Sequence, residues 1–201
     1  MNQHLLIFGS VMLAAWALGT LLLVYFWPHL VNNLYKKAIL DQGFGEGPIP
    51  INTLYTEPKE LFEDPLHAPA SGSKLAVTGV NRDTLLTLGW LDLSQGPQVL
   101  HVPDFSDRYY SVQFTDPFNV NFAYVGTRTT GTQAGDYLIT GPNWQGQLPN
   151  RMAQISAPDN SVLVIGRVLV YSDSDLSTAY DLSKQIQLTP LSGWQPSQPV
   201  P

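Results

Sequence analysis

The chain has no cysteine, only four histidines, and 10 lysines and arginines against 16 acidic residues in 201, which gives a formal net charge of −6. Without cysteine there is no disulfide framework, thiolate-bound zinc, iron–sulfur ligation or cysteine nucleophile. So few basic residues argue against a nucleic-acid surface, because phosphate binding requires a basic patch. No two histidines have metal-ligand spacing on one predicted element, and a Gly-x-Ser-x-Gly motif is absent. We therefore predict no metal site, no cofactor and no conventional serine hydrolase.

Residues 1–27 form a long apolar segment, which we interpret as a transmembrane anchor. From Leu5 to Phe26 there are 22 residues without a charged side chain. A helix of this length spans about 33 Å, enough for a hydrocarbon core of about 30 Å. A cleaved signal peptide is the alternative, but no Lys or Arg precedes the apolar core and Trp27-Pro28-His29 follows it in place of small residues.

Residues 28–43 have the pattern of an amphipathic juxtamembrane helix, with apolar residues at Leu30, Val31, Leu34, Tyr35, Ala38 and Ile39. Three arrangements fit this pattern: a helix lying on the lipid surface, a helix packed on the soluble domain, and a continuation of the anchor beyond a proline kink. Lys36 and Lys37 follow the anchor, so the positive-inside rule favours a cytoplasmic C-terminal domain.

Beyond residue 43 the composition changes twice. A Pro- and Gly-rich linker over 44–74 precedes a β-rich domain over 75–194 and a loose tail over 195–201. Strands are predicted over 75–80, 85–93, 98–102, 108–115, 121–125, 137–140 and 161–171, and a helix over 175–187. The last strand is apolar on both faces, which favours a central place in its sheet. The predicted fold class is mainly β: an antiparallel β-sandwich or barrel-like domain preceded by one transmembrane helix, with one short C-terminal helix.

Motifs across the β-rich region resemble one bacterial family. They are Asn81-Arg82-Asp83-Thr84-Leu85, Trp90-Leu91-Asp92-Leu93-Ser94, Gly96-Pro97, Val102-Pro103-Asp104, Arg108-Tyr109-Tyr110-Ser111-Val112-Gln113, Gly126-Thr127-Arg128-Thr129-Thr130-Gly131-Thr132, Gly135-Asp136-Tyr137 and Gly141-Pro142. In this order, over roughly Val77 to Leu191, they are similar to the family catalogued as domain of unknown function 1254. The resemblance implies a β-rich fold and brings no agreed biochemical role with it.

The same resemblance implies export from the cytoplasm and, for most members, a second domain later in the chain. This sequence ends soon after Leu191, where that domain would begin. We therefore expect the second domain to be absent or supplied by another chain. Export favours a soluble domain on the periplasmic side of a bacterial inner membrane, against the indication from Lys36 and Lys37.

Six polar residues are candidate ligand contacts: Asn81, Arg82, Asp83, Tyr109, Asp116 and Arg128. Arg82 is suited to clamping a carboxylate or phosphate, or to pairing with an internal carboxylate such as Asp83 or Asp116. Arg128 lies in a threonine-rich connection that lacks the Gly-Lys-Ser/Thr ending of a phosphate loop. No catalytic residue is assigned.

Two functions fit these observations. The first is a single-pass, membrane-anchored β-domain that acts as a non-catalytic binding or assembly module. It would contact the lipid bilayer and dock a partner chain carrying the missing second domain, or a second copy of itself. The alternative is a small-ligand-binding protein or hydrolase-like enzyme with a polar pocket near Arg82, Asp116 and Arg128.

Overall fold

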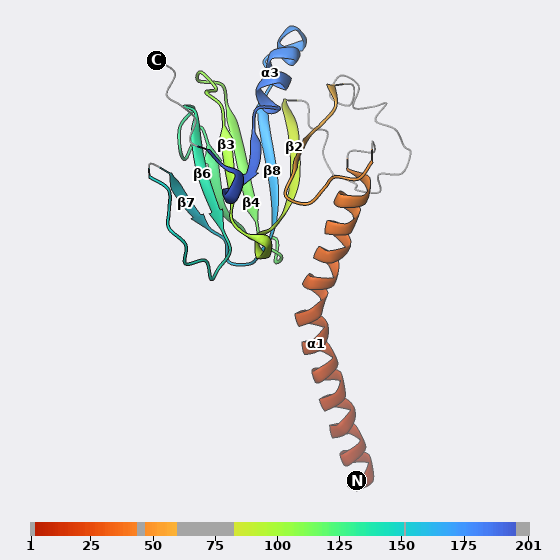
Figure 1. Cartoon of the computed structure of the whole chain (residues 1–201). Coiled ribbons are helices and arrows are strands. Elements are labelled where there is room, and N and C mark those ends of the chain that lie inside the picture. The colour runs from red at the N-terminus through yellow and green to blue at the C-terminus, as the bar shows by residue number, and fades with distance from the viewer. Residues whose placement is uncertain (1–2, 44–46, 60–82, 151, 196–201) are drawn as a thin grey trace.

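The computed structural model describes residues 3–43, 47–59, 83–150 and 152–195 (Figure 1). Its described helices are α1 (Gln3–Gln42) and α3 (Leu176–Ser183). The strands are β1 (Leu54–Thr56), β2 (Thr84–Asp92), β3 (Gln98–Val102), β4 (Tyr110–Thr115), β5 (Asn121–Gly126), β6 (Gly135–Thr140), β7 (Ala153–Ser156), β8 (Ser161–Leu169) and β9 (Gln187–Pro190). Short 3-10 turns are η1 (Leu93–Gln95), η2 (Asp173–Asp175) and η3 (Leu191–Gly193).

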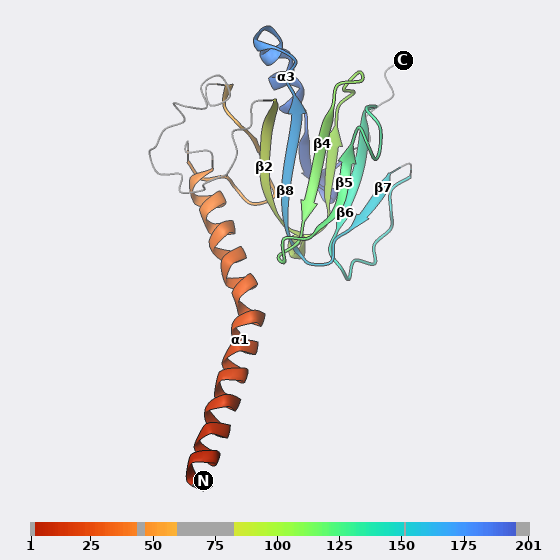
Figure 2. The ribbon, with the colours of Figure 1, turned by 180° about the vertical axis from the view of Figure 1, so that it is seen from behind.

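The strands form two sheets that pack face to face (Figures 1 and 2). One sheet has five strands in the order β1-β2-β8-β4-β5, and the other has four in the order β7-β6-β3-β9. Every pair in the first sheet is antiparallel, whereas β6 and β7 pair in parallel. The predicted mainly β fold is therefore confirmed as a sandwich, with one parallel pair that the antiparallel expectation did not include.

The core between the sheets is built by alternate residues of the long strands. Their inward-facing side chains are Leu85 and Leu91 of β2, Leu100 and Val102 of β3, Tyr110, Val112 and Phe114 of β4, and Val162, Val164 and Val168 of β8. Strand β8 lies between β2 and β4, which confirms the central place predicted for residues 161–171. Its Leu163 faces the other way and packs with Trp90 and Ile39 outside the sandwich.

Helix α1 is continuous from Gln3 to Gln42, with Pro28 inside it. The juxtamembrane residues therefore continue the apolar segment, and they also pack on the domain. Ile39, 2% exposed, contacts the outer face of the five-stranded sheet through Trp90, and the ammonium of Lys36 lies 5.8 Å from the Trp90 ring centre. This contact packs the C-terminal end of α1 against the sheet.

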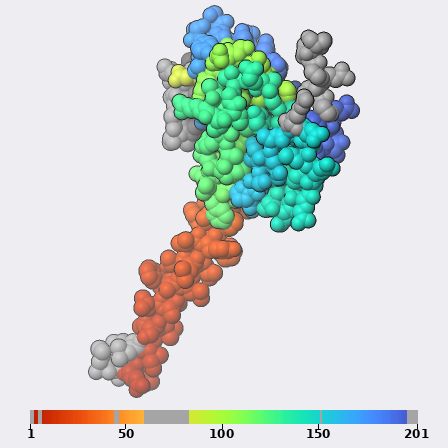
Figure 3. Space-filling model, turned by 90° about the vertical axis from the view of Figure 1, so that its left-hand side faces the viewer, coloured from red at the N-terminus to blue at the C-terminus, as the bar shows by residue number. Residues whose placement is uncertain are grey.

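The N-terminal half of α1 stands clear of the sandwich, as the space-filling view shows (Figure 3). Ile7 to Gln42 is long and apolar enough to cross a membrane, with a mean hydropathy of 2.2 over its most apolar window and none of that window buried in the protein. The side chains most exposed there are large and apolar, among them Phe8, Trp16 and Leu21. Within the described ranges, α1 near the N-terminus is thus the one apolar helix of membrane-spanning length.

Several elements differ from their predicted bounds. The described part of the predicted linker packs on the domain: β1 pairs with β2, and Ile49 is buried. The predicted helix over 175–187 ends at Ser183, because Gln187 belongs to β9, where it pairs with His101 of β3. The predictions missed β7 and β9, and the strand predicted over 75–80 lies outside the described residues.

Candidate functional site

The structure brings two of the six predicted ligand contacts together. The guanidinium of Arg128 lies 5.6 Å from the ring centre of Tyr109, beside the start of β4. Asp116 follows the other end of that strand, about 23 Å away at about 3.3 Å per residue. A single small pocket formed by Tyr109, Arg128 and Asp116 is therefore excluded by distance.

The remaining candidates are Asp83, Asn81 and Arg82. Asp83 is exposed just before β2, where its carbonyl oxygen accepts a hydrogen bond of 2.8 Å from the Val170 amide. Asn81 and Arg82 lie outside the described residues. Ligand binding by this set of residues stays a prediction.

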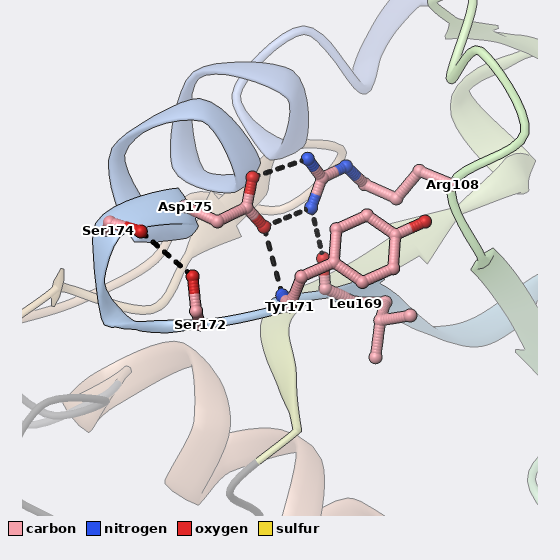
Figure 4. Close-up of polar contacts among 6 residues, drawn as sticks. All are labelled: Arg108, Leu169, Tyr171, Ser172, Ser174 and Asp175. Atoms are coloured by element: carbon pink, nitrogen blue, oxygen red, sulfur yellow. Dashed lines mark hydrogen bonds and ion pairs between the residues drawn. The ribbon is translucent and has the colours of Figure 1, made fainter.

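The strongest polar constellation in the described chain centres on Arg108, which precedes β4 (Figure 4). Its Nη1 donates to Asp175 Oδ2 at 2.6 Å and to the Leu169 carbonyl at 2.7 Å, and its Nη2 donates to Asp175 Oδ1 at 2.7 Å. The Tyr171 ring lies 4.7 Å from the guanidinium, and the Tyr171 amide donates to Asp175 Oδ2 at 2.9 Å. These hydrogen bonds connect Asp175, the residue before α3, to the start of β4 and the end of β8.

Burial and charge reinforce this pair. The Arg108 and Asp175 side chains are 8% and 17% exposed. The hydrogen bonds from Arg108 hold the pKa of the Asp175 carboxyl below its usual value, and the hydrogen bonds to Asp175 raise the pKa of Arg108. Asp175 stands at the N-cap position of α3 but makes no side-chain capping bond, because its carboxylate is committed to Arg108 and Tyr171.

Sequence reasoning missed this role of Arg108. It placed Arg108 at the start of a predicted strand, without a partner. The partner lies 67 residues away, so no local spacing could have indicated the pair. The signal that was available is compositional: an arginine beside two tyrosines, and an acidic residue just before a short helix.

A cleft lies at the far end of α3 from the Arg108–Asp175 pair. Helix α3 covers one end of the sandwich, with Leu176 and Ala179 buried in the core. Its far end and the edge strands β1 and β9 enclose a cleft of about 490 Å³. The lining residues are Asn52, Thr53, Leu54, Tyr55, Thr56, Pro58, Tyr180, Lys184, Ile186, Gln187 and Leu188.

Two lysines flank one tyrosine at this cleft. The ammoniums of Lys59 and Lys184 lie 4.8 Å and 5.2 Å from the ring centre of Tyr180. Lys59 also donates to Ser177 Oγ at 3.1 Å. Within the described ranges, neither lysine forms an ion pair with a carboxylate. The described part of the cleft therefore presents positive charge beside an aromatic ring, an environment that favours anionic groups.

The described lining of the cleft limits which residues could act as an acid or a base there. Its described lining contains no carboxylate and no imidazole, so general acid–base catalysis would have to use a lysine or a tyrosine. Across the described parts of the chain there is no group of three or more His, Asp or Glu side chains placed to hold a metal ion.

These features define a class: a β-sandwich domain preceded by one long apolar helix. A family model described as protein of unknown function (DUF1254) matches residues 63–190, and the chain belongs to this family. A search of curated proteins found no match.

Among solved structures, the fold is similar to the crystal structure of the VPA0106 protein from Vibrio parahaemolyticus, with a TM-score of 0.62 and 25% sequence identity. The match covers 88% of this chain and 40% of that protein, so the chain spans less than half the length of this structural neighbour.

Proposed function

We propose that this protein is a single-pass, membrane-anchored binding module that holds its β-sandwich at the periplasmic surface of a bacterial inner membrane. The observation that carries the proposal is the division of α1. Its N-terminal half is apolar and unburied, whereas its C-terminal end packs on the sheet through Ile39 and Trp90. Exposed apolar surface of this extent is costly in water and is stabilised by a bilayer.

The length and the flanking residues of α1 support this placement. No charged residue occurs between Leu5 and Tyr35, and Tyr25 and Trp27 suit the membrane–water boundary. The packing of Ile39 on the sheet supports a sandwich that is held close to the membrane surface.

Fractionation tests the anchor. The full chain expressed in bacteria is expected in the membrane pellet after alkaline carbonate washing, with its N-terminal residues retained. Leu13→Lys combined with Ala17→Lys should release it, because a charge at the centre of the bilayer costs about 3 kcal/mol per residue in insertion. Lys36→Gln with Lys37→Gln is the control and should leave the protein in the membrane. A soluble mature chain trimmed before Leu30 would contradict the anchor.

Orientation needs its own experiment. An alkaline phosphatase fused after Pro201 is expected to be active, because this enzyme requires the oxidising periplasm to form its disulfides. A fluorescent reporter that matures only in the cytoplasm is expected to be dark in the same position. The opposite pair of results would place the sandwich in the cytoplasm.

The binding function is assigned to the cleft between β1 and β9. Among the described strands, β1 and β9 each end their sheet, and such edges accept an extended segment through backbone hydrogen bonds. Lys59 and Lys184 add positive charge at the same place. The occupant that fits is an extended, acidic segment of a partner protein, and the lack of carboxylate and imidazole in the described lining supports a non-catalytic role.

Site-specific crosslinking tests this occupant. Thr53 lines the cleft and is exposed, so a photoreactive amino acid placed there is expected to crosslink a partner in membranes of the native host. Lys184→Glu should abolish the crosslink by reversing the local charge. Lys37→Glu makes the same change in net charge on exposed α1 surface and should leave it intact.

The identity of the crosslinked peptide decides between occupants. An acidic segment of a different protein supports the proposal. A peptide of this chain itself would show a homo-oligomer instead. A crosslink that survives Lys184→Glu unchanged, or no crosslink with both lysines intact, would contradict the cleft as the binding site.

A further inference from the structure

The connection between β4 and β5 carries apolar side chains that no contact within the sandwich explains. Phe118 is 55% exposed and Val120 is 56% exposed, although both belong to a compact turn. Exposed large apolar residues gathered at one loop tip suggest a surface that is covered in the working protein.

The turn is closed by hydrogen bonds that centre on Asp116. Its Oδ1 accepts hydrogen bonds of 2.9 Å from the amides of Phe118 and Val120. Backbone bonds from Asp116 N to the Val120 carbonyl and from Asn119 N to the Asp116 carbonyl close the same loop. Asp116, a predicted ligand contact, therefore has a structural task here: it holds the two apolar side chains in a fixed presentation.

An aromatic contact shows which part of α1 this loop lies beside. The rings of Phe118 and His29 lie 5.0 Å apart between centroids at an interplanar angle of 71°, and His29 in turn lies 5.8 Å from Tyr25. The loop thus sits beside the turn of α1 that follows Tyr25 and Trp27, the aromatic residues expected at the membrane–water boundary. Trp27 and Leu30, on the same stretch of helix, are 56% and 53% exposed.

From this placement we infer that the β4–β5 loop is a second membrane contact, which inserts Phe118 and Val120 into the boundary between lipid headgroups and acyl chains. This inference rests on the proposed anchoring. It adds that the domain is held against the bilayer at two points, which fixes its orientation and turns the opposite end of the sandwich, where α3 lies, away from the lipid. The occupant is the lipid surface because the helix that brings the loop there is itself the membrane-spanning element.

The absence of cysteine makes a direct test possible, because any introduced cysteine is unique in the full chain. Val120→Cys, Ala17→Cys and Gln133→Cys place one environment-sensitive fluorophore on the loop, in the anchor, and on the exposed connection between β5 and β6 at the other end of the sandwich. Each protein is reconstituted into phosphatidylcholine vesicles, with or without a doxyl quencher near the top of the acyl chains.

The fluorophore on the loop, carried by Val120→Cys, is expected to emit at shorter wavelength than the one carried by Gln133→Cys. It should also lose intensity with the quencher, whereas the Gln133→Cys label should not. Phe118→Ser added to Val120→Cys should shift the loop emission back toward that of the Gln133→Cys protein, because the apolar side chain of Phe118 next to the label is lost.

Three other outcomes would overturn the inference. If the label in Ala17→Cys is quenched while the loop label is water-like and unquenched, the membrane contact of the loop is contradicted and the transmembrane anchor is supported. A water-like label at all three positions would overturn both the inference and the anchor. A loop label that is shielded from water but insensitive to the quencher would assign the loop to a protein contact and overturn the lipid assignment.

Discussion

The Arg108–Asp175 pair is a largely buried ion pair, and Asp175→Asn tests it with almost no change in side-chain volume. The substitution removes the charge, and the amide group can no longer accept from both guanidinium nitrogens and the Tyr171 amide at once. Arg108 would stay 8% exposed, with the Leu169 carbonyl, the Tyr171 ring and at most the single amide oxygen of the asparagine as its partners.

The expected cost follows from burial. Removing one partner of a buried ion pair costs about 3–5 kcal/mol, because the other charge is left uncompensated. Asp175 is 17% exposed, and the asparagine keeps part of the hydrogen bonding, so we expect a loss of about 2–4 kcal/mol. Asp173→Asn removes the same charge from an exposed neighbouring position and should cost less than about 0.5 kcal/mol.

The assay is equilibrium urea unfolding of the full chain in mild detergent, followed by near-ultraviolet circular dichroism. The pH dependence adds a second check. The folded-state pKa of Asp175 is lowered, so its stabilisation is complete above its unfolded value of about 3.9 and is lost as the pH falls through the lower folded value. The gap between wild type and Asp175→Asn should therefore be full at pH 7 and close in acid. Equal costs for Asp175→Asn and Asp173→Asn, or a gap that persists undiminished in strong acid, would refute the reasoning.

Two further predictions concern the outer face and the edge of the five-stranded sheet. Trp90→Ala removes a side chain that is 1% exposed and contacts Ile39, so it should cost about 3–5 kcal/mol and make the end of α1 accessible to protease, whereas Tyr124→Ala, at a 44% exposed position, should do neither. Burial raises the pKa of Glu57, so the stabilising contribution of its protonated form is present in acid and is lost as the pH rises through the folded-state pKa. Glu57→Gln should therefore be more stable than wild type at pH 7, with the difference shrinking in acid; a constant difference in urea unfolding across that range would contradict this.

Most long strands could be predicted because their burial follows from local alternation. Residues 98–102 form β3 as predicted, and the apolar run from Ser161 became the central strand β8. The short edge strands β1, β7 and β9 were missed, because three or four residues carry too little periodicity and edge strands need not be apolar. One signal for β1 was present in Gly89: a Cβ there would lie 2.5 Å from the Thr53 carbonyl oxygen, so glycine permits the close approach of this segment to β2.

The candidate site was harder to predict than the fold. Among the described candidates, Asp116 lies apart from Tyr109 and Arg128, since it organises its own turn while they meet at the other end of β4. The cleft combines Lys59 with Lys184 across more than a hundred residues of sequence, and neither lysine belongs to a recognisable motif. Such a site depends on which strands end the two sheets.

The sequence alone determined what depends on composition and on neighbouring residues: an apolar helix long enough for a bilayer, a β-rich domain, and membership of a family through ordered motifs. These properties follow from local hydrophobicity and periodicity. Only the tertiary structure decided that α1 is seated on the sheet through Trp90, that Arg108 holds α3 through Asp175, and that Phe118 lies beside His29. Each of these contacts joins residues distant in the chain, and its energy comes from burial and geometry that exist only once the chain has folded.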